Sequence, residues 1–287
     1  MSSPGTARRL WALGEPFHAL IYFADEVRGA GAAAGLTGFW QTYFAFRAAP
    51  LGVVGAEVVT ATFYNFAPSF VAARVPAVWD AVSPAGALGA RLAGVDAAVR
   101  RVLGEDWPDS AEAAEAADLA RAAAAAVDLP GRPLAAANTA VPVPEEPHLA
   151  LWQCLTVLRE HRGDGHNAAL LQREVDGAGA HVLAAAAGRS PREWLQRARG
   201  WDDAAWDDAV ERLTERHWLD GDALSAEGLT MVAAIEADTD RLALGPWQAL
   251  GDPGCDRLAA LLGPIRRAVV AAGDWPVHNP IGVPEPD

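Results

Sequence analysis

Lysine is absent from the 287-residue sequence, and all 23 basic residues are arginine. Because 37 residues are acidic, the formal net charge at pH 7 is -14. Proteins that bind nucleic acid usually present a basic face that neutralises phosphates, and acidic membranes attract basic segments. DNA and membranes are therefore not expected as partners, unless a local basic patch exists.

Cysteine is scarce, and long apolar runs are missing. Cys154 and Cys255 are far apart and no C-x-x-C pair occurs, which favours a reducing cytoplasm over a disulfide framework. The apolar runs are short or contain arginine, so no membrane span is predicted. The stretch after Arg8 and Arg9 is broken by Gly14 and Pro16 before a signal-type apolar core can form. We expect a cytoplasmic protein.

Several common catalytic motifs are also missing. The sequence has no G-x-S-x-G elbow, no P-loop and no G-x-G-x-x-G loop. His161 and His166 are five residues apart and H-E-x-x-H is absent, so we expect no metal site. No cofactor and no catalytic residue can be assigned from these patterns.

What the sequence does contain is helical periodicity. We predict an all-α fold with a small β-wing, in two packed helical halves. The halves are an N-terminal helical domain (1–127) and a C-terminal helical domain (148–272), with a Pro-rich connecting loop (128–147) between them and an extended tail (273–287). The connecting loop is indicated by five prolines, at 130, 133, 142, 144 and 147.

The clearest local unit covers 190–242 and is typical of a winged helix. A helix expected over 204–217 is followed by the turn Asp220-Gly221-Asp222, and Ser225 is a good cap for a long helix reaching Leu242. The candidate recognition helix and its lead-in, 202–216, carry six acidic residues and two arginines, which gives 2 − 6 = -4. That charge would repel phosphates, so we expect the module to serve packing or protein contact.

Two segments carry candidate binding chemistry. In the first, 160–167, two imidazoles, a guanidinium and two carboxylates surround glycines that we expect to interrupt a helix at 162–165. There Arg162 would hold an anion, Asp164 would orient it and His166 would exchange protons; His161 lies beside them. The alternative is that Asp164 only caps the next helix and pairs with Arg162 or His166.

The second segment centres on Arg47, at the end of an aromatic helix that contains Trp40 and Tyr43. An arginine there either pairs internally or lines a pocket. Aromatic side chains elsewhere in the N-terminal half can supply its walls, and they would otherwise form an ordinary aromatic core. The further candidate ligand-binding residues are His18, Tyr64 and Asn65.

Several segments together resemble one known family. They are FRAAPLG (46–52), EHRGDGH (160–166), GW (200–201), ADTDRL (237–242) and GPW (245–247). Over nearly the whole chain the sequence resembles an actinobacterial family that carries a helix-turn-helix label, because its C-terminal part is similar to MarR-type winged helices. The resemblance implies a fold and not an activity.

Our leading hypothesis is a small-molecule-binding or sensing protein that does not bind DNA directly. Arg47 and the cluster of Arg162, Asp164 and His166 would anchor a polar or anionic group, and aromatic rings would hold an apolar body. Two alternatives stay open: a winged-helix transcriptional regulator, and an enzyme that uses His166 and Asp164 for acid-base chemistry. A homodimer is a further open alternative.

Overall fold

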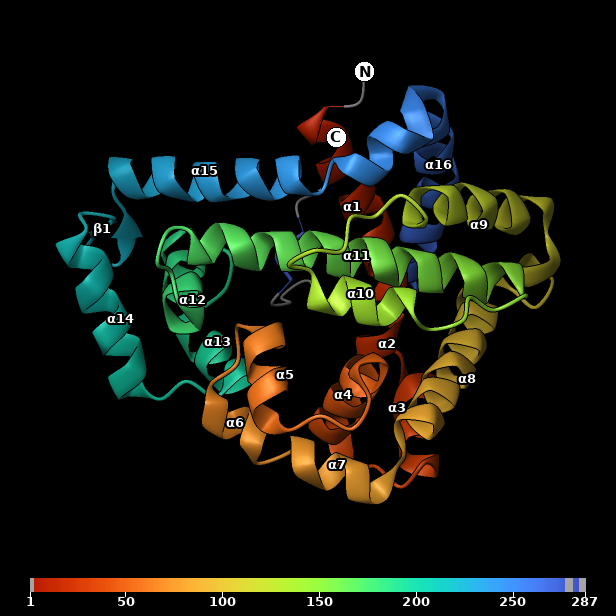
Figure 1. The fold of residues 1–287 in the computed structure, drawn as a ribbon, viewed down its shortest axis with the longest axis horizontal. Coiled ribbons are helices and arrows are strands. Elements are labelled where there is room, and N and C mark those ends of the chain that lie inside the picture. Colours follow the sequence, from red (N-terminus) through yellow and green to blue (C-terminus); the bar gives the residue numbers. More distant parts are fainter. Residues whose placement is uncertain (1–2, 277–280, 284–287) are drawn as a thin grey trace.

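The computed structural model describes residues 3–276 and 281–283, and its described elements are helical except for one β-hairpin (Figure 1). The all-α expectation is therefore confirmed. In chain order the elements are α1 (Pro4–His18), α2 (Leu20–Phe23), α3 (Asp25–Ala33), α4 (Gly38–Ala48), η1 (Ala49–Leu51), α5 (Ala56–Phe63), α6 (Pro68–Ala72), α7 (Val75–Ala81), α8 (Pro84–Leu103), η2 (Trp107–Asp109), α9 (Ala111–Ala124), α10 (Pro133–Thr139), α11 (Pro147–Leu171), α12 (Gly177–Ala186), α13 (Arg192–Arg199), α14 (Asp203–Glu215), β1 (Leu219–Asp220), β2 (Ala223–Leu224), α15 (Ala226–Leu242) and α16 (Gly245–Ala271).

Several helix starts follow from capping side chains that the sequence displays. Ser83 accepts a hydrogen bond from the Gly86 N–H at the start of α8, and Asp202 accepts one from Ala205 at the start of α14. Ser225 does the same for α15. These short polar side chains satisfy N–H groups that have no partner within the first turn.

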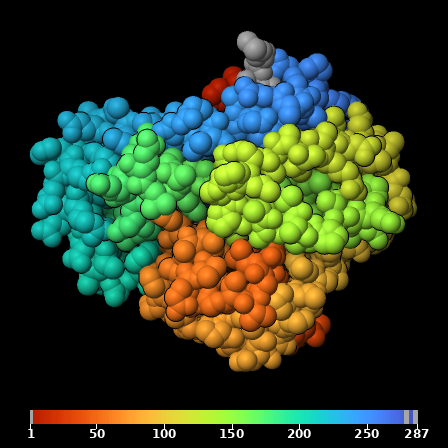
Figure 2. All heavy atoms as spheres, viewed as in Figure 1, coloured from red at the N-terminus to blue at the C-terminus, as the bar shows by residue number. Residues whose placement is uncertain are grey.

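Helix α11 passes through the centre of the molecule (Figure 1). It is buried along most of its length, because helices from both halves of the chain pack around it. The largest hydrophobic core joins α11 to α1, α8, α9 and α16, with Trp152 of α11 fully buried. Figure 2 shows the N-terminal segments in orange against the green and teal C-terminal segments.

The predicted interruption of this helix at 162–165 is wrong. Helix α11 is continuous from Pro147 to Leu171. Glycine inside a helix costs only about 1 kcal/mol relative to alanine, and Gly165 lets α11 approach its neighbours closely. A Cβ atom there would lie 2.9 Å from the Arg132 Nη1 atom and 3.2 Å from Leu242 Cβ.

The segment 128–147 is not wholly a loop either, since it contains α10. Pro133 occupies the first turn of this helix, where a missing N–H costs nothing. Leu134 and Ala135 are buried against α11, and that packing stabilises a short helix that the prolines obscured.

A second hydrophobic core lies at the other end of α11. Trp206 and Leu213 of α14 pack there with Ile235 of α15 and with residues of α12. The hairpin pairs Leu219 with Leu224 in antiparallel register, and α15 follows it directly. The helices and the hairpin expected between 190 and 242 are therefore present. Most of the tail predicted to be extended lies outside the described residues.

Candidate functional site

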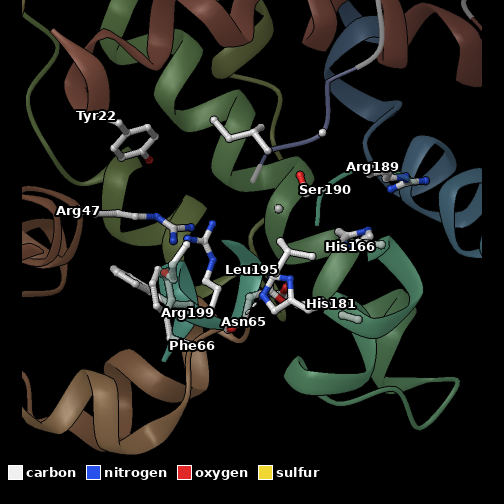
Figure 3. Close-up of a pocket in the computed structure, with 18 of the residues that line it drawn as sticks. Tyr22, Arg47, Asn65, Phe66, His166, His181, Arg189, Ser190, Leu195 and Arg199 are labelled. Carbon is white, nitrogen blue, oxygen red and sulfur yellow. Dashed lines mark hydrogen bonds between the residues drawn. The ribbon is translucent and has the colours of Figure 1, made fainter. Parts of the chain in front are cut away.

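A cavity of about 300 Å³ lies where the N-terminal helices meet α11, α12 and α13 (Figure 3). Aromatic side chains from both parts of the chain line much of it; they include Tyr22, Phe39, Trp40, Phe63, Phe66 and Trp194. Pockets that bind small molecules combine mostly apolar walls with a few placed polar groups. The polar groups of this cavity fall into two sets.

The first set is a cluster of three arginines from three helices, which we call the arginine cluster: Arg47 of α4, Arg159 of α11 and Arg199 of α13. Arg47 forms a two-point ion pair with Glu160, its Nε and Nη2 atoms each lying 3.1 Å from a carboxylate oxygen. The Arg159 Nη1 atom lies 2.9 Å from the same carboxylate. Glu160 is therefore shared between two guanidinium groups.

Glu15 supplies a second carboxylate beside the arginine cluster. It accepts hydrogen bonds from Arg159 at 3.3 Å and from the Trp11 indole at 2.9 Å. Burial would raise the pKa of Glu160, but Arg159 and Arg47 outweigh it and lower that pKa to about 2. Burial dominates at Glu15 and raises its pKa. Glu160 is therefore the firmly ionised partner of the cluster.

Arg199 has no carboxylate partner among the described residues. Its side chain is buried, its Nη1 atom donates to the Ala198 carbonyl oxygen at 3.0 Å, and its Nε atom is buried without a partner. The guanidinium lies 4.6 Å from the centre of the Phe66 ring. Burial, together with the nearby Arg47 and Arg159, lowers the pKa of Arg199 to about 10, so it is charged at neutral pH.

The arginine cluster thus carries more positive than negative charge. Three guanidinium groups face two carboxylates, those of Glu15 and Glu160. A buried charge without a partner is costly. In Figure 3 the head groups of Arg47 and Arg199 extend toward one another inside the cavity. An anion bound between them would supply the missing negative charge.

Two tyrosine hydroxyls lie beside the arginine cluster, with their ring centres 5.1 Å apart. The Tyr43 oxygen accepts a hydrogen bond from Arg47 at 3.1 Å, so its own hydrogen can be donated elsewhere. The Tyr22 hydroxyl is 3.2 Å from His18 Nε2. The cluster therefore combines charged and neutral donors.

His18 lies behind Tyr22, outside the cavity wall. Its Nδ1 atom is 3.0 Å from the Thr156 hydroxyl, which itself donates to the Trp152 carbonyl oxygen at 2.9 Å. The threonine hydrogen is thus in use, so His18 Nδ1 carries the hydrogen and Nε2 accepts one from Tyr22. Burial holds the pKa of His18 well below its ordinary value, which keeps the ring neutral.

The second polar set surrounds His166 of α11 and includes Arg162, Arg189, Glu236 and Thr239. The His166 Nδ1 atom lies 3.0 Å from the Thr239 hydroxyl. Glu236 is paired with Arg189 at 3.2 Å and lies 3.6 Å from Arg162. Burial lowers the pKa of His166.

Six of the ten residues proposed from the sequence line the cavity: Trp40, Tyr43, Arg47, Asn65, Arg162 and His166. The other four do not, and each has a partner elsewhere. The Tyr64 hydroxyl donates to the Val175 carbonyl oxygen, His161 pairs with Asp128 at 2.7 Å, and Asp164 accepts from the Ala135 N–H at 2.9 Å; His18 is described above.

The continuity of α11 explains this division. Arg159, Arg162, Gly163 and His166 are spaced i, i+3, i+4 and i+7, so they share the helix face that lines the cavity. Asp164 lies on the face toward α10. The pairing of His166 with Asp164 that the enzyme hypothesis needs is therefore absent, and His166 is held by Thr239 instead.

The interpretation from sequence missed Arg159, Arg199 and His181. Arg159 stands one turn before Gly163 and would have been found from an uninterrupted helix. Arg199 and His181 belong to α13 and α12, and no local pattern relates them to Arg47. His181 donates from Nε2 to the Asn65 carbonyl oxygen at 3.1 Å, and burial lowers the pKa of His181 to about 3.

Across residues 3–276 and 281–283, no cluster of three or more His, Cys, Asp and Glu side chains is arranged to hold a metal ion. In the same part of the chain, no single helix is long and apolar enough to cross a membrane. One bent pair, 38–51 with 56–63 at 91°, meets that criterion by length and composition alone.

The fold and the cavity define a helical protein with an arginine-lined cavity between its helices. A family model described as a helix-turn-helix family matches residues 7–276, and the chain therefore belongs to that family. No curated protein matches the chain. No solved structure matches it either.

Proposed function

We propose that the protein binds a small organic anion with an apolar, ring-containing body in this cavity. The observation that carries the proposal is Arg199, a buried guanidinium without a carboxylate partner in the described chain. A carboxylate bound there would pair with Arg199 through charge-assisted hydrogen bonds. The Tyr43 hydroxyl, whose oxygen already accepts from Arg47, would donate to the same group.

The aromatic residues of the cavity wall favour a ligand whose apolar part is flat. Phe63 and Phe66 lie under the guanidinium groups of Arg47 and Arg199 at 4.1 and 4.6 Å. Stacking holds those head groups in place before a ligand arrives, which reduces the entropy lost on binding. Trp40 and Trp194 add apolar surface to the wall.

The test is a comparison of matched probes by thermal shift and calorimetry. Benzoate, phenylacetate and 3-phenylpropionate should stabilise the protein, whereas their carboxamides and benzylamine should not. Ligand at about 100 times its Kd adds about 2.7 kcal/mol to the free energy of unfolding. Arg199→Met should abolish this response, because it removes the unpaired charge but keeps much of the side-chain volume.

Arg192→Met is the matched control, because Arg192 lies on the same helix α13 but pairs with Asp203 and Asp207 at the surface. Its response to the anions should equal that of the wild type. The free Arg199→Met protein should be at least as stable as the wild type, since an uncompensated charge is replaced by an apolar group. Equal stabilisation by acids and amides would contradict the proposal.

Membership of the helix-turn-helix family favours a second function, that of a winged-helix transcriptional regulator. We propose that α12, α13 and α14, with the hairpin, form its winged helix, in which α14 occupies the place of the recognition helix. Helix α13 carries Arg199 into the cavity and passes through Gly200 into α14. A ligand at Arg199 would then bias the position of α14.

The negative charge on α14 allows the regulator hypothesis to be tested by DNA binding. The acidic residues at its start and along it, from Asp202 to Glu215, are all exposed. We expect no salt-dependent DNA binding at low ionic strength in a mobility-shift assay that uses DNA upstream of the gene. A specific shift that weakens with salt would favour the regulator and contradict our expectation that DNA is not a direct partner.

A further inference from the structure

The hydrogen atom on His166 can be placed from the partners of Thr239. The Thr239 hydroxyl lies 2.8 Å from the Ile235 carbonyl oxygen, to which it donates. Its oxygen can then only accept from His166 Nδ1, 3.0 Å away. His166 therefore carries its hydrogen on Nδ1, and its Nε2 atom keeps a free lone pair. His18, Thr156 and the Trp152 carbonyl repeat this arrangement.

The Nε2 atom of His166 has no hydrogen-bond donor in the part of the chain that is described. The ring lies on the cavity wall, across from the arginine cluster (Figure 3). The nearest carboxylate, Glu236, is already paired with Arg8 and Arg189 at 3.2 Å each, and Arg162 is close to it. Glu236 favours a protonated imidazole, but burial and the nearby Arg162 and Arg189 oppose it, and the pKa of His166 is lowered.

A second unpaired acceptor lies in the same cavity. The side-chain oxygen of Asn65, Oδ1, is buried and has no donor among the described residues. The main-chain oxygen of Asn65 already accepts from His181 and from the Trp201 indole at 3.0 Å. Away from the arginine cluster, the cavity thus holds two acceptors without a donor among the described residues, His166 Nε2 and Asn65 Oδ1. A buried acceptor such as Asn65 Oδ1 is costly when it has no donor.

We propose that the ligand is a hydroxyl-bearing organic anion. This inference rests on the anion site proposed above and adds the chemistry of the other end of the molecule. The anionic group pairs with Arg199, and the hydroxyl donates to His166 Nε2. A neutral donor fits better than an ammonium group, because Arg162 and Arg189 flank His166 and the Glu236 carboxylate is already paired with arginines.

The test uses pairs of probes that differ only in the hydroxyl. Benzoate, phenylacetate and 3-phenylpropionate are each compared by calorimetry with their 3-hydroxy, 4-hydroxy and 4-methoxy derivatives. One hydrogen bond to a neutral acceptor corresponds to about five- to tenfold in affinity. We expect at least one hydroxy acid to bind tighter than its parent by that factor, and its methoxy derivative to lose the gain.

Variants test whether the gain in affinity from the hydroxyl comes from His166. His166→Phe should show no preference for the hydroxy acid over its parent, the preference being the ratio of the two dissociation constants measured in the same variant. Thr239→Val should reduce the preference, because it releases the hydrogen from Nδ1. Thr230→Val is its control, since Thr230 is exposed on the same helix and donates only to the Ala226 carbonyl oxygen. In imidazole nitrogen NMR spectra, Nε2 of His166 should be the unprotonated nitrogen.

The outcomes separate the two proposals. If hydroxy and parent acids bind equally, if the preference survives in His166→Phe, or if Nε2 carries the hydrogen, the hydroxyl inference is overturned. In those cases, loss of binding in Arg199→Met would still uphold the anion site. If no acid binds the wild type, both proposals fail.

Discussion

At the scale of single residues, the cavity contains buried polar atoms that lack partners among the described residues. Glu160 is fully buried and yet paired with two arginines, whereas Arg199 and Asn65 hold buried atoms with no partner in the described chain. Native proteins leave few such atoms, and the exceptions concentrate where a ligand or another group completes them. Both unpaired residues line the same cavity, which is why we place the site there.

Asp164 offers a residue-scale prediction on pH. Burial raises the pKa of Asp164 to about 6, and one of its oxygens is buried with no partner among the described residues. Between about pH 4 and pH 6 the unfolded chain has lost this proton while the folded protein keeps it. Stability from this group is therefore present at low pH and is lost as the pH rises through the folded pKa.

The measurement is the free energy of unfolding of the wild type minus that of Asp164→Asn, from urea titrations at pH 4 to 7. This difference should fall with rising pH, by at most about 3 kcal/mol. Gln172→Ala, at an exposed position next to the end of α11, changes no titratable group, serves as the control and should give a flat difference. A difference for Asp164→Asn that is flat or rises would contradict the assignment.

At the scale of elements, glycines decide how closely helices approach. Gly228 of α15 is buried under the hairpin, and a Cβ atom there would lie 2.0 Å from the Trp218 carbonyl oxygen. That oxygen is main chain and cannot rotate away. Helix α15 can therefore support the hairpin only if this position has no side chain.

Replacing each of two glycines with alanine tests this, because the two variants should change the free energy of unfolding in opposite directions. Gly228→Ala should lower the free energy of unfolding by about 2 kcal/mol, because the hairpin must shift. Gly89→Ala, in an exposed position of α8 with open space around it, should raise it by up to about 1 kcal/mol through helix propensity. Chemical denaturation of both variants gives the comparison. Equal effects would contradict the packing argument.

At the scale of the whole molecule, the cavity joins parts of the chain that have different cores. Phe63 belongs to the hydrophobic core formed by α4 to α7, and Tyr43 packs against it. Leu195 belongs to the hydrophobic core around α14. The helices α4, α5 and α13 all contribute side chains to the cavity wall. A ligand bound there would tie these cores together.

Hydrogen exchange measured by mass spectrometry tests this coupling. With the tightest anion bound, amide exchange should slow in α4, in the segment around Asn65 and in α13. Helix α9, which supplies no residue to the cavity wall, should be unchanged. Protection spread equally over α9 and α13, or absent from α13, would contradict a site at this junction.

Some of the fold could be predicted from the sequence because its cause is local. The helix that ends at Leu242 was predicted with nearly its observed bounds, since Ser225 is a cap and the apolar spacing is regular. The predicted helix interruption at 162–165 is wrong for the opposite reason. Glycine weakens a helix locally, but burial of α11 among neighbouring helices outweighs that loss.

The sequence by itself determined the helical class, the caps, the acidic surface of α14 and the candidate status of Arg47, Arg162 and His166. These features depend on residue type and on neighbours within a few positions. Only the tertiary structure decided that Arg199 joins Arg47 without a carboxylate of its own, and that Asp164 faces away from His166. Burial and charge pairing are set by residues distant in sequence, so no local pattern specifies them.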